Sequence, residues 1–296
     1  MIEPEATLAA PAHRRDAPHA PADPALEVVI RPTPGWRAVN WAEMYEFREL
    51  LGYLVWRDVA ARYKQSVLGP AWALLQPMIM VVIFTFVSRF LSIPMPDGLP
   101  APVVIFAALI PWTMFAQGMP AAAGSLVASI NMVTKVYFPR LFLPFAAAAV
   151  FLVDGILTLP VFGLLLAYYG VAPSWTIVFL PVFYLLTLIA ALGIGVALAA
   201  LTAFYRDFKH IVPFLVQIMM YVTPVFYTIE PTIPARWRPV LALNPMFGIT
   251  DGFRATALGL PMPWVSLLIS TASALAIFTA ALFYFRRSER LFADHV

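Results

Sequence analysis

Two cations and one acid are the side chains of this 296-residue chain whose placement could do chemistry. Arg62 and Lys64 stand just before the first long apolar stretch, where they could hold an anionic group such as a phosphate. Asp154 lies inside a later apolar stretch, and an acid at membrane depth is a candidate functional residue. Both sites have a plainer alternative. The cations could only anchor a helix at the membrane surface, and Asp154 could be a packed helix contact bonded to a neighbouring hydroxyl, with Arg89 as a poorly matched candidate partner.

The sequence lacks the residues that several other chemistries require. None of the three lysines follows a glycine, so there is no phosphate-binding loop of the Gly-Lys-Ser/Thr kind. The four histidines lie outside the apolar stretches, which argues against a metal site within the membrane. Paired carboxylates are missing at membrane depth, and the chain has no cysteine for disulfides or thiolate chemistry. We therefore expect no metal site, no cofactor bound by this chain and no catalytic residue.

The elements that must position these residues are apolar helices. Hydrophobic residues make up 61% of the chain. Charged residues make up 12%, against roughly 25% in a soluble domain. This composition predicts an all-α polytopic membrane protein and argues against a soluble enzyme, a disordered scaffold or a nucleic-acid binder. Six stretches reach or approach the roughly 20 residues that a crossing helix needs: 70–91, 102–130, 141–168, 176–203, 211–228 and 263–285.

The basic residues predict which side of the membrane each loop faces. Six crossings put both termini on one side, and most arginines and lysines then fall in the segments on that same side. The outer segments hold Arg236, Arg238 and Arg254, with Arg89 near an outer end. The positive-inside rule therefore predicts that both termini lie in the cytoplasm.

The pattern along the chain predicts four parts. Residues 1–39 are rich in Ala and Pro and are expected to form a disordered cytoplasmic tail. Residues 40–66 are expected to form an amphipathic helix lying in the membrane interface, although packing on a soluble partner would also fit. Residues 67–290 form the six-span domain, and 291–296 form a cytoplasmic C-terminal tail.

The outer segment 229–262 is expected to be re-entrant. Proline interrupts it too often for a span, yet it is too apolar for a free loop. Two short helices dipping into the outer leaflet would fit, because irregular backbone at membrane depth must be buried in protein. A compact outer loop is the alternative.

The segment RDVAARYKQSVLGPAWALLQP, residues 57–77, resembles the signature of the polysaccharide-exporting permeases of the type-2 ABC exporter family, the Wzm, KpsM and TagG group. VYFPRLFLP at 136–144 and LNP at 243–245 also resemble that pattern, and the resemblance covers residues 40–290. It implies a homodimer in the bacterial inner membrane that pairs with a separate ABC ATPase subunit (Wzt-like), which binds ATP and Mg. The implied cargo is lipid-linked polysaccharide of the O-antigen type, with capsular polysaccharide, teichoic acid, or a drug or lipid as alternatives.

The resemblance also implies roles for individual residues. The cargo would enter past Arg62, Tyr63, Lys64, Ser66, Leu68 and Gly69. Sugars pack on aromatic faces, so the expected channel lining is Trp72, Gln76, Phe84, Phe86, Trp112, Phe115, Tyr137 and Phe138. Two inner loops are expected to contact the ATPase through Asn131, Lys135, Arg140, Arg206, Asp207 and Lys209. The plain alternatives are that the aromatics belong to the interface belts and that the loop charges only set topology.

Two functions from other classes stay open beside the permease. A membrane-embedded lipid-glycan transferase would need an acidic or histidine cluster at one leaflet, which the sequence does not show. An assembly or anchoring protein would bind a partner through its outer segment, but it would not need the 57–77 motif or a basic inner entrance.

Overall fold

The apolar stretches fold into helices, and the residues that the computed structural model describes contain no strand. The described ranges are 41–64, 71–96, 98–205 and 207–289. The predicted all-α membrane class is confirmed. Several expectations lie outside the described residues: the tail 1–39, the entrance residues Ser66, Leu68 and Gly69, the loop residue Arg206, and the end 291–296.

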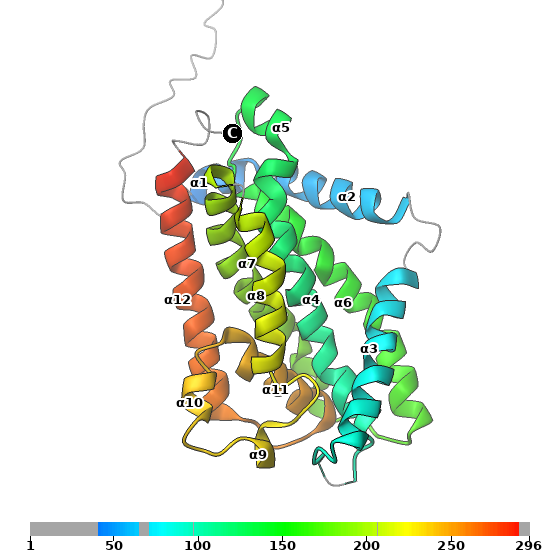
Figure 1. The fold of residues 1–296 in the computed structure, drawn as a ribbon. Coiled ribbons are helices and arrows are strands. Elements are labelled where there is room, and N and C mark those ends of the chain that lie inside the picture. Colours follow the sequence, from blue (N-terminus) through cyan, green and yellow to red (C-terminus); the bar gives the residue numbers. More distant parts are fainter. Residues whose placement is uncertain (1–40, 65–70, 97, 206, 290–296) are drawn as a thin grey trace, which may run out of the picture. The chain divides into compact units, whose positions relative to one another are not determined.

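Within the described ranges, five helices are long and apolar enough to cross a membrane. They are α3 (Ala71–Phe90), α4 (Ala101–Ala128), α6 (Phe142–Tyr168), α7 (Leu180–Phe204) with the preceding 3-10 helix η1 (Trp175–Phe179), and α12 (Trp264–Glu289). Their bounds agree with five of the six predicted spans to within a few residues. From α3 through α4 and α6 to α7 the direction of the spans alternates along the chain, whereas α12 runs in the same direction as α4 and α7 (Figure 1).

The predicted sixth span, 211–228, is shorter than expected. It becomes α8 (Phe208–Val222), and its 15 residues rise only about 22 Å, less than the roughly 30 Å hydrocarbon core. The helix ends because Thr223 precedes Pro224 and adopts an extended backbone, with ψ of 135°. A residue before proline is disfavoured in the helical region. The sixth crossing therefore stays a prediction.

The predicted interface helix 40–66 is two helices, α1 (Trp41–Glu46) and α2 (Arg48–Lys64), broken at Phe47. The apolar face expected from the sequence packs on the protein: Leu54 is fully buried, and Leu50 and Leu51 pack against the same cluster. Helices α1 and α2 lie across one end of the bundle, beside α5 (Ile130–Lys135) and the last turns of α12 (Figure 1).

Helix α4 forms the centre of the bundle. In the most apolar stretch of α4, 83% of the residues are buried inside the protein, against 22% in the corresponding stretch of α3. It packs most closely on α7, where a Cβ on Gly195 would lie 2.7 Å from the Ala122 Cβ and 3.0 Å from the Met119 carbonyl oxygen. Small residues at such contacts let two helix backbones approach within a membrane.

The outer segment 229–262 holds three helices rather than the predicted two: α9 (Ile229–Thr232), α10 (Arg238–Leu241) and α11 (Pro245–Leu258). Asn244 caps the start of α11, its side chain accepting from the Met246 N–H at 3.0 Å, and Gly259 in the left-handed conformation caps its end. Every residue of α11 except Asp251 is buried. Such burial favours a re-entrant helix over a loop free in solvent, and its depth in the membrane stays a prediction.

Candidate functional site

Asp154 is bonded to the last turn of α2. The Arg62 Nη2 lies 2.8 Å from the Asp154 Oδ2, and the Tyr63 hydroxyl donates to the Oδ1. The same Nη2 donates to the Gln117 Oε1 of α4 at 3.0 Å. The guanidinium also lies over the Phe151 ring, 4.6 Å from its centroid. Three elements, α2, α4 and α6, thus meet at one cation.

The packing of α2 along the first half of α6 explains this partner. Leu54 of α2 shares an apolar cluster with the first turns of α6, and Asp154 follows Phe142 by about 18 Å along the α6 axis. Arg62 and Tyr63, in the last turn of α2, therefore reach the acid. The other candidate partner, Arg89, is exposed in the last turn of α3 and makes no ion pair with the described residues.

The ion pair is partly desolvated. The side chain of Asp154 is 9% exposed and that of Arg62 is 30% exposed. Burial, together with the hydrogen bond to Asp154, raises the pKa of Tyr63 to about 12, so its hydroxyl remains a proton donor at neutral pH. The carboxylate thus accepts from two donors on α2, and the cation stays reachable from the surface. This arrangement can hold an anion through Arg62.

The remaining entrance residue within the described chain, Lys64, is exposed and makes no ion pair with the described residues. Sequence reasoning missed Gln117 and Phe151. Gln117 did leave a trace, because an amide stands out in the otherwise apolar stretch of α4. Nothing in the sequence distinguishes Phe151 from the other aromatic residues.

The eight residues expected to line a channel differ in burial. Trp72 and Phe86 of α3 are 53% and 71% exposed, and Tyr137 is also exposed. Gln76 and Phe84 are half-buried, and the Phe84 ring packs 5.4 Å from the ring of Phe226.

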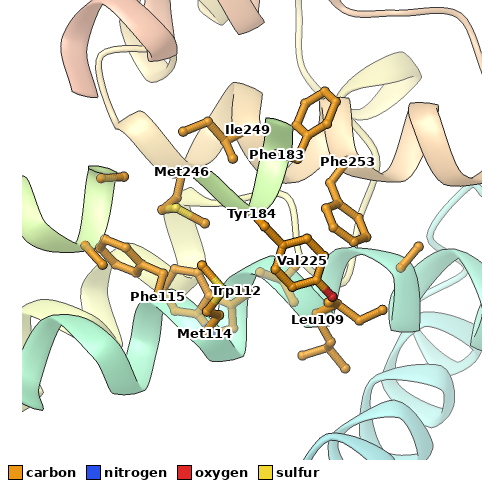
Figure 2. Close-up of a cluster of buried hydrophobic side chains, with 14 of the residues drawn as sticks. Leu109, Trp112, Met114, Phe115, Phe183, Tyr184, Val225, Met246, Ile249 and Phe253 are labelled. Atoms are coloured by element: carbon orange, nitrogen blue, oxygen red, sulfur yellow. The ribbon is translucent and has the colours of Figure 1, made fainter. Parts of the chain in front are cut away.

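The other three aromatics lie in the core. Trp112 is 3% exposed, Phe115 is fully buried, and their ring centroids are 5.7 Å apart within the cluster shown in Figure 2. Phe138 is buried in a second cluster, beside the start of α6. Packing in the core is enough to explain these three positions, because the side chains are buried against other residues of the same chain. Their contact with a passage stays a prediction.

The loop expected to contact the ATPase is bonded to α1 and to the last residue of α12. The Tyr137 hydroxyl donates to the Glu43 Oε1 of α1 at 3.1 Å, and the Arg140 Nη1 donates to the carbonyl oxygen of Glu289 at 2.8 Å. Arg286 of α12 pairs with the Glu289 carboxylate at 2.6 Å and lies 3.9 Å from that of Glu43. Burial and the bond to Glu43 raise the pKa of Tyr137. A force on this loop would therefore reach α1 and α12.

The other expected ATPase contacts are accessible. Asn131 and Lys135 are exposed on α5, which projects from the end of the bundle where α1 and α2 lie (Figure 1). Asp207 and Lys209 are exposed at the start of α8. Exposure is necessary for a contact with a partner, and these roles stay predictions.

A second charged cluster, which sequence reasoning read only as an outer charge, surrounds Arg254 of α11. The side chain is 1% exposed. Its Nη1 donates to the Asp251 Oδ1 at 2.9 Å and to the Tyr227 carbonyl at 3.1 Å, while its Nη2 donates to the carbonyls of Pro224 and Val225. The loop after α8 is thereby fastened to α11. The sequence signal that could have indicated this cluster is an Asp three residues before an Arg within an apolar segment.

A cavity of about 500 Å³ lies between the end of α6, η1 and the start of α7, and none of the charged residues of the two clusters lines it. Its lining side chains, such as Leu159, Phe162 and Ile177, are all apolar. It has no group that could fix an anionic head group, so it is not the counterpart of the Arg62 cluster. Among the described residues, no three His, Asp or Glu side chains gather as a metal site would require.

Comparison with known proteins adds the family context. The sequence model of the family described as "ABC-2 type transporter" matches residues 49–258. The O-antigen export system permease protein RfbA of Myxococcus xanthus is 31% identical over 263 residues, which are 86% of this chain and 98% of that protein. A Klebsiella pneumoniae protein of the same name is 26% identical over 239 residues, covering 79% and 91%. The capsule polysaccharide export inner-membrane protein CtrC of Neisseria meningitidis is 21% identical over 238 residues, covering 75% and 85%.

Proposed function

The chain belongs to the ABC-2 type transporter family, and we propose that it is the permease subunit of an ATP-driven exporter of lipid-linked polysaccharide. O-antigen type cargo is preferred because the relatives named for O-antigen export are 31% and 26% identical over most of their length. Capsular polysaccharide is the second candidate, supported by the 21% identity to the capsule export protein.

The Arg62 cluster is the observation that carries this proposal. A lipid-linked glycan has a phosphate or diphosphate between the lipid and the sugar, so its head group is anionic while the sugar can be neutral. Arg62 offers a partly exposed cation at the end of α2, close to the start of the first span. Cations at the cytoplasmic edge of a membrane attract anionic head groups. Sugars would then pass exposed aromatics such as Trp72 and Phe86.

The exporter would need two further kinds of subunit. One is an ABC ATPase subunit (Wzt-like) that binds ATP and Mg, docking on the exposed residues of α5 and the start of α8. The other is a second copy of this chain, for which the little-buried α3 offers an apolar face. The chain would lie in the bacterial inner membrane with both termini in the cytoplasm, as the distribution of its basic residues predicts.

Reconstitution tests the proposed function. The chain is purified with its ATPase subunit in lipid nanodiscs, and ATP hydrolysis is measured with a lipid-linked glycan, with the same glycan freed from its lipid, and with an apolar drug. Stimulation by the lipid-linked form alone is expected. No stimulation by it, or equal stimulation by the drug, would overturn the proposal.

A double variant tests the cationic entrance. Arg62→Gln/Lys64→Gln should abolish most of the glycan export while leaving the complex with the ATPase intact. Arg236→Gln removes an exposed cation from the outer segment and is the matched control. Export at the wild-type rate in the double variant would remove these two residues as a cargo site.

A further inference from the structure

Arg62 is held in a way that closes both of its strong anion-binding edges. A guanidinium grips a carboxylate or phosphate with two parallel bonds, from Nε and Nη2 on one edge or from Nη1 and Nη2 on the other. Both edges need Nη2. Here the two protons of Nη2 are directed to Asp154 at 2.8 Å and to Gln117 at 3.0 Å. An outside anion therefore finds single donors but no free two-pronged edge.

We propose that Asp154 is an internal stand-in for the cargo's phosphate, and that a head group with more than one negative charge displaces it from Arg62. This inference rests on the proposed function, and it adds a specificity residue to it. The exposed fractions of the two side chains indicate from which side the anion arrives, because Arg62 is 30% exposed and Asp154 only 9%. The anion approaches the cation from the surface while the carboxylate lies behind it.

The free energy of separating Asp154 from Arg62 would make the site selective for the charge of the head group. Separating a buried ion pair leaves an uncompensated charge, which is costly. A phospholipid phosphodiester carries one negative charge, the same as the carboxylate it would replace, so it gains little by displacing Asp154. A phosphomonoester or diphosphate carries more charge and more acceptor oxygens. The site would thus ignore the anionic lipids that surround it and respond to a lipid diphosphate.

Tyr63 and Gln117 would take part in the exchange. The Tyr63 hydroxyl donates to the Oδ1 of Asp154, so it can keep one bond to the carboxylate after Arg62 has turned away. Gln117 accepts from Arg62 through its Oε1, and its amide nitrogen can donate to a phosphate oxygen. The Phe151 ring, whose centroid lies 4.6 Å from the guanidinium carbon, blocks movement of the cation toward that side.

Binding of three probes to the purified full chain in nanodiscs tests the inference. The probes are farnesyl diphosphate, inorganic diphosphate, and phosphatidylglycerol supplied as part of the nanodisc lipid to compete. We expect Asp154→Asn to bind farnesyl diphosphate about fivefold to tenfold more tightly, the difference between charged and neutral hydrogen-bond partners. We also expect this variant to become sensitive to phosphatidylglycerol, which the wild type tolerates.

The matched control removes the same charge from α2. Asp58 pairs with Arg57 at 2.7 Å, so Asp58→Asn should leave the affinity and the lipid tolerance unchanged. Thermal unfolding of each variant reports whether it is folded. Should Asp154→Asn fail to fold, Asp154→Ser is neutral and smaller and has the same expected behaviour.

Each outcome decides a different point. Equal or weaker farnesyl diphosphate binding by Asp154→Asn would overturn the stand-in and leave Asp154 as a structural anchor of Arg62. Tighter binding of both diphosphates supports it with the free anion as a sufficient ligand, and tighter binding of farnesyl diphosphate alone supports it with a lipid as the source. If no probe binds while the lipid-linked glycan still stimulates ATP hydrolysis, this inference fails and the proposed function stands.

Discussion

Arg254 should contribute strongly to the stability of the segment that joins α8 to α11. Arg254→Met keeps most of the apolar stem and removes every donor. The Asp251 carboxylate and the carbonyls of Pro224, Val225 and Tyr227 then lose their shared partner. Removing one member of a buried ion pair costs about 3–5 kcal/mol. Further lost hydrogen bonds would add to this cost, but water can reach Asp251, whose side chain is 16% exposed. We therefore keep the range at about 3–5 kcal/mol.

Thermal unfolding in one detergent measures this cost. For a chain of this size 1 kcal/mol corresponds to about 2–4 °C, so Arg254→Met should lower the unfolding midpoint by roughly 6–20 °C. Arg236→Met is the control, because Arg236 is exposed and its guanidinium lies over the neighbouring Trp237 ring. It should change the midpoint by no more than about 2 °C.

A double variant separates the buried charge from the rest. Arg254→Met/Asp251→Leu leaves no unpaired carboxylate, so it should be more stable than Arg254→Met alone. The reasoning is refuted if Arg254→Met unfolds at the same temperature as Arg236→Met, or if the second substitution makes the protein still less stable.

Three further predictions concern packing and coupling. Gly248→Ala would put a Cβ 2.3 Å from the Ser266 carbonyl oxygen, so it should force α11 from α12 and cost about 1–3 kcal/mol in thermal unfolding. Trp112→Ala should cost about 3–5 kcal/mol because the ring is buried, whereas Trp72→Ala should leave stability nearly unchanged and lower glycan export. Tyr137→Phe should leave the unfolding midpoint in place but accelerate amide hydrogen exchange in residues 130–137, because the bond to α1 is lost.

Each of these has a matched control. Gly124→Ala meets nothing within 4 Å and should be neutral or slightly stabilising, so an equal loss in both glycine variants would contradict the close contact at Gly248. Normal export in Trp72→Ala would remove it from the passage. Tyr53→Phe alters an exposed tyrosine of α2, and equal exchange rates in the two tyrosine variants would mean that Tyr137 does not hold its loop.

The helices and the membrane class could be predicted because both depend on the hydrophobicity and helix propensity of residues that are close together in the sequence. The length of an apolar run shows whether a helix there could cross a membrane, and a proline marks a position where a helix can end. Even the early end of α8 was readable in principle, since Pro224 disfavours a helical Thr223. The sequence of α11 likewise carries its own boundaries, an Asn cap before Pro245 and a left-handed Gly259 after Leu258.

Which aromatic side chains are buried could be decided only from the tertiary structure. In a membrane protein both the core and the lipid-facing surface are apolar, so a tryptophan on a spanning helix has the same sequence context in either place. Trp72 and Trp112 look alike in sequence, yet one is 53% exposed and the other 3%. Only the packing of α4 among α3, α6, α7 and α11 separates them.

The sequence alone determined that the chain is helical, that it belongs in a membrane, that its basic residues favour one side, and that Asp154 is an unusual acid within an apolar run. It did not determine what Asp154 binds. Arg62 and Asp154 are separated by 92 positions in the chain, and their meeting depends on how α2 packs along α6. Hydrophobicity is a local property that every stretch carries by itself. The pairing of two distant charges exists only once the helices have packed.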